Sequence, residues 1–174
     1  MSLSVDLKMR MMLDEYLGNI GTEVVNGEAN ERTLDLTPVG IPQFTQSSIQ
    51  IFGEHSLLEV GDRDGNKDWI EGTLVKVPQK IITPSDCGIS HKKNLLTIFV
   101  KTTKEKGLYY NEAVSSIVET YFPNNTHIKR DSDDTLITIL KSYQQPTTYL
   151  NKDIGRFQNR VYVDVEMYYS NKNN

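Results

Sequence analysis

One segment, residues 94–128, constrains the fold most because it joins a clear strand pattern to a clear helix pattern. Between Leu95 and Val100 apolar residues occupy both alternating sets, so an extended chain carries them on both faces of a sheet. This pattern predicts an inner strand that is covered on both faces. The short basic stretch Lys101 to Gly107 follows it and is expected to form a loop.

After that loop, apolar residues return at spacings of three and four, which place them in one stripe along a helix. The stripe consists of Tyr110, Ala113, Val114, Ile117, Val118 and Tyr121. Pro123 and Asn124 then predict the end of the helix. The segment therefore predicts a strand, a basic loop and a helix that packs through one face.

Length and charge limit the classes of protein to which the chain belongs. A chain of 174 residues is expected to form one domain, residues 1–174, with a core of ordinary size. The net charge of −4 argues against broad nucleic-acid binding, and the single cysteine, Cys87, excludes an internal disulfide. No apolar run reaches the roughly 18 residues of a membrane span, and the amino-terminal stretch lacks the apolar block of a secretory signal. We therefore expect a soluble, cytosolic chain.

A first helix is predicted near the amino terminus, with Ser4 as its cap and Gly18 or Gly21 near its end. Its helically spaced apolar residues are Val5, Met9, Met12, Leu13, Tyr16, Leu17 and Ile20. We interpret this stripe, methionines included, as core packing rather than an adaptable binding face.

Residues 21–90 form a variable, loop-rich and strand-rich region in this interpretation. Glycine and proline interrupt residues 21–53, which are expected to be loop with one short strand at most. Residues 48–52 and 57–60 are compatible with short extended pieces. Alternation from Trp69 to Val77 predicts a strand, in which Gly72 is expected to weaken packing or to mark a bulge.

The polar run before that strand resembles part of a calcium-binding loop. Asp62, Asp64 and Asn66 have the spacing of the first three ligands of an EF-hand. However, Lys67 replaces the turn glycine and Thr73 stands where the bidentate glutamate is required. The Asp64-Gly65 pair is instead typical of a tight hairpin turn, so we predict a solvated turn and no metal.

The carboxyl-terminal half contains a further hairpin and a long strand. Residues 84–93 are expected to be a loop that leads into the central strand, and residues 142–155 a longer connection. Residues 126–128 and 136–140 predict a hairpin with an acidic tip in water, and alternation from Val161 to Tyr169 predicts a strand with one wet face.

The order of these elements predicts an α+β fold. A helix, irregular strands, a long strand, a second helix, a hairpin and a final long strand suit a mostly antiparallel sheet with both helices packed on one face. Residues 94–169 supply the central part, and residues 21–90 an irregular insertion.

Catalytic chemistry is not indicated by any motif in the sequence. There is no phosphate-binding glycine loop, nucleophile elbow or pair of histidines at metal-ligand spacing, and His55, His91 and His127 fall in separate predicted segments. We therefore assign no catalytic, cofactor-binding or metal-binding residue, and expect a protein that is not an enzyme.

The central stretch and the last strand together resemble the small tail terminator proteins of long-tailed bacteriophages. The corresponding elements are an amino-terminal amphipathic helix, a strand at residues 95–100, a loop with Gly107, a helix that ends at Phe122-Pro123, and a long alternating strand at residues 161–169. The resemblance covers about half of the chain by element, and residues 21–90 are longer and more irregular than the family requires.

This resemblance implies a structural virion protein. Such subunits form a hexameric ring on the last ring of the tail tube, stop tube polymerisation and present a surface to the head-completion protein in the neck. Two alternatives remain open: a head-to-tail connector or tail-completion protein of related fold, and a small soluble enzyme or ligand-binding domain.

A closed ring requires two different complementary flanks on each subunit. The basic loop and the acidic hairpin tip have opposite charges and could meet between subunits or face the tube, and the lone tryptophan is a residue type enriched at interfaces. Ordinary solvated turns and a core tryptophan are the alternative interpretations. The candidate interface residues are Lys101, Lys104, Lys106, Asp131, Asp133, Asp134 and Trp69.

Overall fold

The computed structural model describes residues 5–18, 20, 22–25, 28–31, 49–52, 68–77, 89–129, 135–150 and 155–170. Its helices are α1 (Val5–Gly18) and α2 (Gly107–Tyr121), with a 3-10 turn, η4 (Lys104–Lys106), immediately before α2. The strands are β1 (Thr22–Val25), β2 (Glu28–Glu31), β3 (Ile49–Phe52), β4 (Asp68–Lys76), β5 (Ile89–Thr103), β6 (Thr126–Lys129), β7 (Leu136–Gln144), β8 (Thr148–Leu150) and β9 (Arg156–Ser170).

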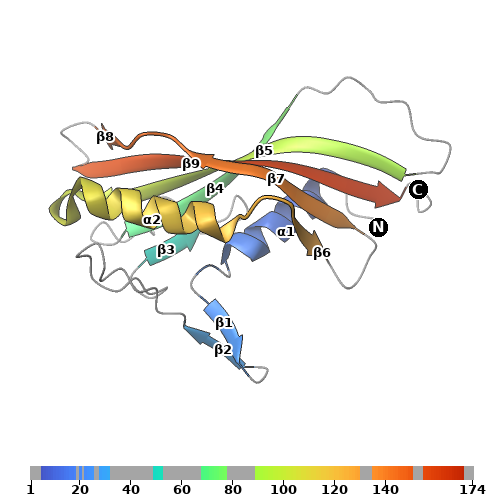
Figure 1. Cartoon of the computed structure of the whole chain (residues 1–174), viewed down its shortest axis with the longest axis horizontal. Coiled ribbons are helices and arrows are strands. Elements are labelled where there is room, and N and C mark those ends of the chain that lie inside the picture. The colour runs from blue at the N-terminus through green and yellow to red at the C-terminus, as the bar shows by residue number, and fades with distance from the viewer. Residues whose placement is uncertain are drawn as a thin grey trace.

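The main sheet has seven strands in the order β3-β4-β5-β9-β7-β6, with β8 also paired to β9. All of its pairings are antiparallel except β3 with β4. Both helices lie below the sheet in Figure 1, on the same side of it. The predicted α+β class, with a mostly antiparallel sheet and two helices on one face, is confirmed.

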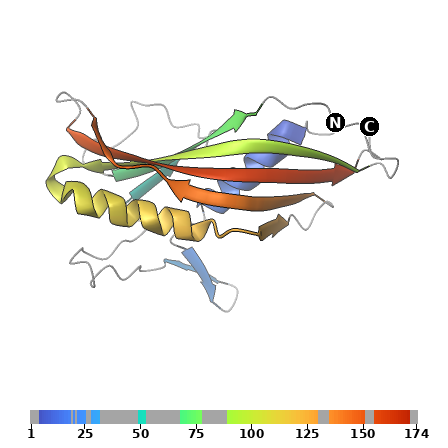
Figure 2. The same ribbon diagram turned by 45° about the horizontal axis from the view of Figure 1, so that its top comes forward.

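Two long strands, β5 and β9, form the centre of the sheet. They pair along their whole lengths, from Ile89 opposite Ser170 to Thr103 opposite Arg156. Figure 2 shows this pair running the length of the molecule. The predicted inner strand is confirmed, but its limits were wrong: it starts within the expected 84–93 loop, because the length of β9 gives those residues a backbone partner.

One hydrophobic core fills the space between the helices and the sheet. Even-numbered residues of β4 and β5 and odd-numbered residues of β9 face it, as the alternation predicted. The helices also touch each other: the Tyr16 hydroxyl donates to the Tyr121 carbonyl at 3.0 Å, and the rings of Tyr16 and Phe122 lie edge to face. The main buried residues are Met9, Leu13, Leu17, Ile70, Leu96, Ile98, Val114, Val118, Phe122, Ile137, Ile139, Val161, Val163 and Val165.

The opposite face of the sheet, called here the open face, is less completely covered along the central strand. Leu95 and Phe99 are only half-buried there, whereas Leu96 and Ile98 on the helix side are buried. Both described helices lie on the other side of the sheet. Thr97, between them on the open face, is buried, so among the described residues the strand is covered on both faces but more completely on the helix side.

Three further local predictions need correction. Residues 22–25 and 28–31 are the antiparallel strands β1 and β2, which pair with each other outside the main sheet, whereas loop with one short strand at most was expected there. Residues 148–150 form β8 within the expected connection, because β9 is long enough to pair with it beyond β7. A register shift between Ile139 and Lys141 brings Tyr143 to the open face opposite Tyr162.

Other predictions are confirmed or lie outside the described residues. Confirmed are the helix boundaries, the strand over Trp69 to Val77, the extended piece over residues 49–52, and the antiparallel pairing of β6 with β7. Outside the described residues lie the Ser4 cap, Gly21, His55, residues 57–60, the turn at residues 61–67, Cys87 and the acidic tip with Asp131, Asp133 and Asp134.

Candidate interaction surface

The connection between β5 and α2 is a tight turn rather than the expected loop. The strand continues to Thr103, and the three residues of η4 then lead into the helix at Gly107, whose φ is +79°. Glycine adopts this left-handed conformation without steric cost. The basic stretch is thus divided between a strand end and a short turn.

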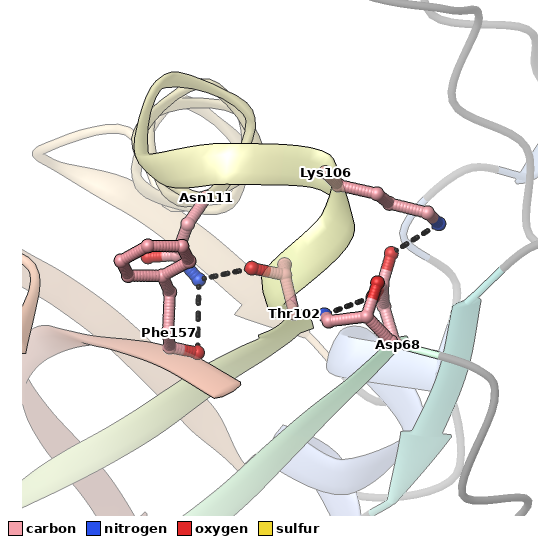
Figure 3. Close-up of polar contacts among 6 residues, drawn as sticks. Asp68, Thr102, Lys106, Asn111 and Phe157 are labelled. Carbon is pink, nitrogen blue, oxygen red and sulfur yellow. Dashed lines mark hydrogen bonds and ion pairs between the residues drawn. The ribbon is translucent and has the colours of Figure 1, made fainter. Parts of the chain in front are cut away.

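Asp68 fastens this turn to β4. Its side chain is fully buried, and it accepts hydrogen bonds from the Thr103 backbone N–H at 2.8 Å and from the Lys106 ammonium at 2.6 Å. Figure 3 shows the contact between Lys106 and Asp68. Burial, together with the adjacent Asp68 charge and a hydrogen bond to Asp68, raises the pKa of Tyr110 well above its usual range. The turn is therefore fixed by a buried, paired carboxylate.

Asn111 fastens the first turns of α2 to the sheet. Its side-chain amide donates to Thr102 Oγ1 at 3.0 Å and is within reach of the Phe157 carbonyl, as Figure 3 shows. The Val100 carbonyl is also within hydrogen-bond distance of this amide, at 3.2 Å. The side-chain oxygen of Asn111, Oδ1, accepts a hydrogen bond from Thr147 Oγ1 at 3.2 Å. Thr147 Oγ1 in turn accepts a hydrogen bond from the Asn159 side-chain amide at 3.0 Å. This buried network joins β5, α2, the link between β7 and β8, and β9.

These anchors support an exposed tip surface, which consists of Lys104, Glu105, Leu108 and Tyr109. Tyr109 is 80% exposed and Leu108 is 39% exposed, although both are large and apolar or aromatic. The two charged members of the tip surface, Lys104 and Glu105, are also exposed. An exposed aromatic ring and an exposed aliphatic side chain at the start of α2 have the chemistry of a protein-protein contact.

Two further candidate residues, Trp69 and Lys101, lie on the open face and are in contact with each other. The Arg156 guanidinium lies 3.9 Å from the Trp69 ring centroid, and the Lys101 ammonium lies 5.6 Å from it. Lys101 also pairs with Glu71 at 3.3 Å. Trp69 is half-buried on the open face rather than in the core.

The structure thus separates the three predicted lysines. It brings Lys101 against Trp69, ties Lys106 to Asp68, and leaves Lys104 exposed in the turn. Asp131, Asp133 and Asp134 lie outside the described residues, so their predicted role stays a prediction.

Sequence reasoning missed Asp68, Asn111 and Tyr109. A signal for Asn111 existed, because an amide lies between Tyr110 and Val114 in the apolar stripe, where a buried polar group needs partners. Neither Asp68 nor Tyr109 had such a signal. The burial of Asp68 depends on its position beside strand β5, and the exposure of Tyr109 depends on the direction of α2.

Two other kinds of site were also considered. Among the residues that the structure describes, no three histidine, cysteine or acidic side chains are grouped so that they could hold a metal ion. In the same part of the chain, no helix is long and apolar enough to cross a membrane.

Comparison with known proteins adds information on the fold alone. No protein-family model matches the chain, and no curated protein matches it. One solved structure, of a protein whose name states no function, is 10% identical, covers 95% of this chain and 96% of its own, and superimposes with a TM-score of 0.58. At this identity the likeness establishes that the complete fold occurs in another protein.

Proposed function

We propose that the protein is the ring-forming subunit of a phage tail terminator. In this proposal six copies cap the tail tube, stop its polymerisation and provide the surface for the head-completion protein, without catalysis. The protein would be assembled in the host cytoplasm and reside in the neck of the virion. The order of elements supports this proposal, because the long strand, the helix ending at Phe122-Pro123 and the closing strand pack as one sheet-and-helix unit.

The observation that carries the proposal is the tip surface. Each subunit of a closed ring needs two different complementary surfaces, and the tip surface is a candidate for one of them. Tyr109 and Leu108 project from the start of α2, while Asp68 and Asn111 hold the turn and helix behind them. The surface also contains Lys104 and Glu105, so it offers both signs of charge around an apolar centre, as protein interfaces commonly do.

A direct test replaces the apolar members of the tip surface. Leu108→Ser and Tyr109→Ser are expected to reduce the hexamer seen by native mass spectrometry, both for the protein alone and for the protein bound to tail tubes. Met11→Ser is a matched control, because Met11 is 38% exposed on the other helix and Leu108 is 39% exposed. A hexamer that persists in both tip variants contradicts the role of this surface.

The biological role is tested by omission. Phage assembled without the protein should have tail tubes of abnormal and variable length that do not join heads, as measured by electron microscopy. Tubes that still stop at one length and join heads normally would rule out a terminator.

A further inference from the structure

The charged side chains along β9 on the open face are complementary to those of a second β9 that runs in the opposite direction. Along β9, every second side chain faces this side of the sheet: Arg156, Gln158, Arg160, Tyr162, Asp164, Glu166 and Tyr168. The basic residues precede Tyr162 and the acidic residues follow it. A second β9 placed antiparallel over the first, centred on Tyr162, would bring Arg160 of each copy over Asp164 of the other.

These two charges are available for such a contact. Arg160 is exposed and Asp164 is partly exposed, and neither forms an ion pair with another described residue. The Arg160 guanidinium lies 5.5 Å from the Phe99 ring centroid, and Asp164 lies opposite the exposed Lys141 in the register. They are four residues apart on one strand, roughly 13 Å at about 3.3 Å per residue, so they do not pair within one chain. Two other pairs of charges on this face are matched internally, Lys101 with Glu71 and Lys93 with Glu166, while Lys141 lies over the Tyr143 ring.

The centre of the open face is apolar and aromatic. Tyr162 lies between Thr97 and Tyr143 in the register, and the Tyr143 and Tyr162 rings are 5.5 Å apart. Tyr143 and Val75 remain substantially exposed, at 38% and 45%. Removing such side chains from water stabilises an interface, and aromatic residues and arginine are enriched there.

The size of the face is at the lower limit for a stable contact. β5 and β9 cross it for about twelve residues, whereas β4 lies beside them only opposite residues 158–165 of β9 and β7 only opposite residues 161–168. At about 3.3 Å per residue and about 4.8 Å between strands this gives roughly 600 Å² per copy, near the lower end of the approximately 1,200–2,000 Å² in total that stable interfaces bury.

We infer that the open face binds the open face of a second copy of this chain, in a two-fold symmetric sheet-on-sheet contact with Arg160 and Asp164 paired twice. Two-fold symmetry repeats each contact, so a single residue pair acts twice. This contact uses a different surface from the tip surface, and it does not depend on the proposed ring.

Charge reversal tests the pairing. Arg160→Asp and Asp164→Arg each place like charges against each other twice, so each should raise the dimer dissociation constant by about tenfold or more in sedimentation equilibrium. An equimolar mixture of the two variants should restore association, because both contacts in the mixed dimer are again opposite in sign. The double variant R160D/D164R should also restore it, which excludes misfolding as the cause.

Two controls separate this proposal from the ring. Glu15→Arg reverses an exposed charge on α1 and should leave the dissociation constant unchanged. Leu108→Ser alters only the tip surface and should also leave this dimer intact. Wild-type protein that is monomeric into the millimolar range, reversed variants that associate normally, or a mixture and double variant that fail to restore association would each overturn the inference.

Discussion

Gly72 leaves room for Leu17. A Cβ placed on Gly72 would lie 2.7 Å from Leu17 Cδ2, closer than carbon atoms approach without displacement. β4 pairs with β5 in continuous register through this position, so the glycine marks no bulge. Its role is to let α1 pack closely on the sheet, which corrects the expectation that it would weaken packing or mark a bulge.

Gly72→Ala is therefore expected to destabilise the protein by about 1–3 kcal/mol, because Leu17 is buried and must shift within a packed core. Urea unfolding followed by circular dichroism measures this change. Gly18→Ala is the matched control: its added Cβ would meet no atom within 4 Å, so stability should be unchanged or rise slightly. Shortening the opposing side chain with Leu17→Val should recover part of the loss in Gly72→Ala.

Asn111→Ala should cost about 2–4 kcal/mol of unfolding free energy, because it leaves Thr102 and Thr147 without their buried partner. Thermal and urea unfolding check this value. Thr120→Ala removes an exposed hydroxyl that bonds only within α2, and it should change stability by less than about 0.5 kcal/mol. Equal effects of the two substitutions would show that the network contributes little.

Lys106→Met should destabilise the protein by about 1–3 kcal/mol, because the buried Asp68 carboxylate loses its cation while its bond to the Thr103 N–H remains. Hydrogen exchange of the Thr103 amide should accelerate as well. Lys104→Met removes a neighbouring exposed charge from the same turn and should alter neither quantity. If both lysine variants behave alike, Asp68 is not the anchor of the turn.

Asp6 should make stability depend on pH in acid. Hydrogen bonds from Lys92 and Lys76 lower the pKa of Asp6 below 3.8, against the opposing effect of burial. Because the folded-state pKa is the lower one, the stabilisation is present above the unfolded-state value and is lost as pH falls through the folded-state value.

Asp6→Asn should therefore lower the unfolding free energy by about 0.2–1 kcal/mol at neutral pH, with a difference from wild type that shrinks below pH 3.8. Urea unfolding across an acid pH series measures this dependence. Glu15→Gln, at an exposed position on the same helix, should show no comparable dependence. A pH-independent loss in Asp6→Asn would contradict the ion-pair explanation.

Local periodicity was sufficient to identify the main elements and the fold class. The stripes of α1 and α2 and the alternation of β4, β5 and β9 are properties of neighbouring residues, and each must bury one face. From these the sequence alone determined the α+β class, the mostly antiparallel sheet and the placement of both helices on one face. It also placed the central strand inside the sheet.

Only the tertiary structure decided which polar and small residues serve that fold. Asp68 becomes buried because β5 ends beside it, and Gly72 becomes essential because Leu17 comes from a helix more than fifty residues away. The length of β5, the pairing of β8 and the reversal of faces after Ile139 all depend on β9 as a partner. These features arise from contacts between segments that are distant in the sequence, and local sequence patterns cannot predict such contacts.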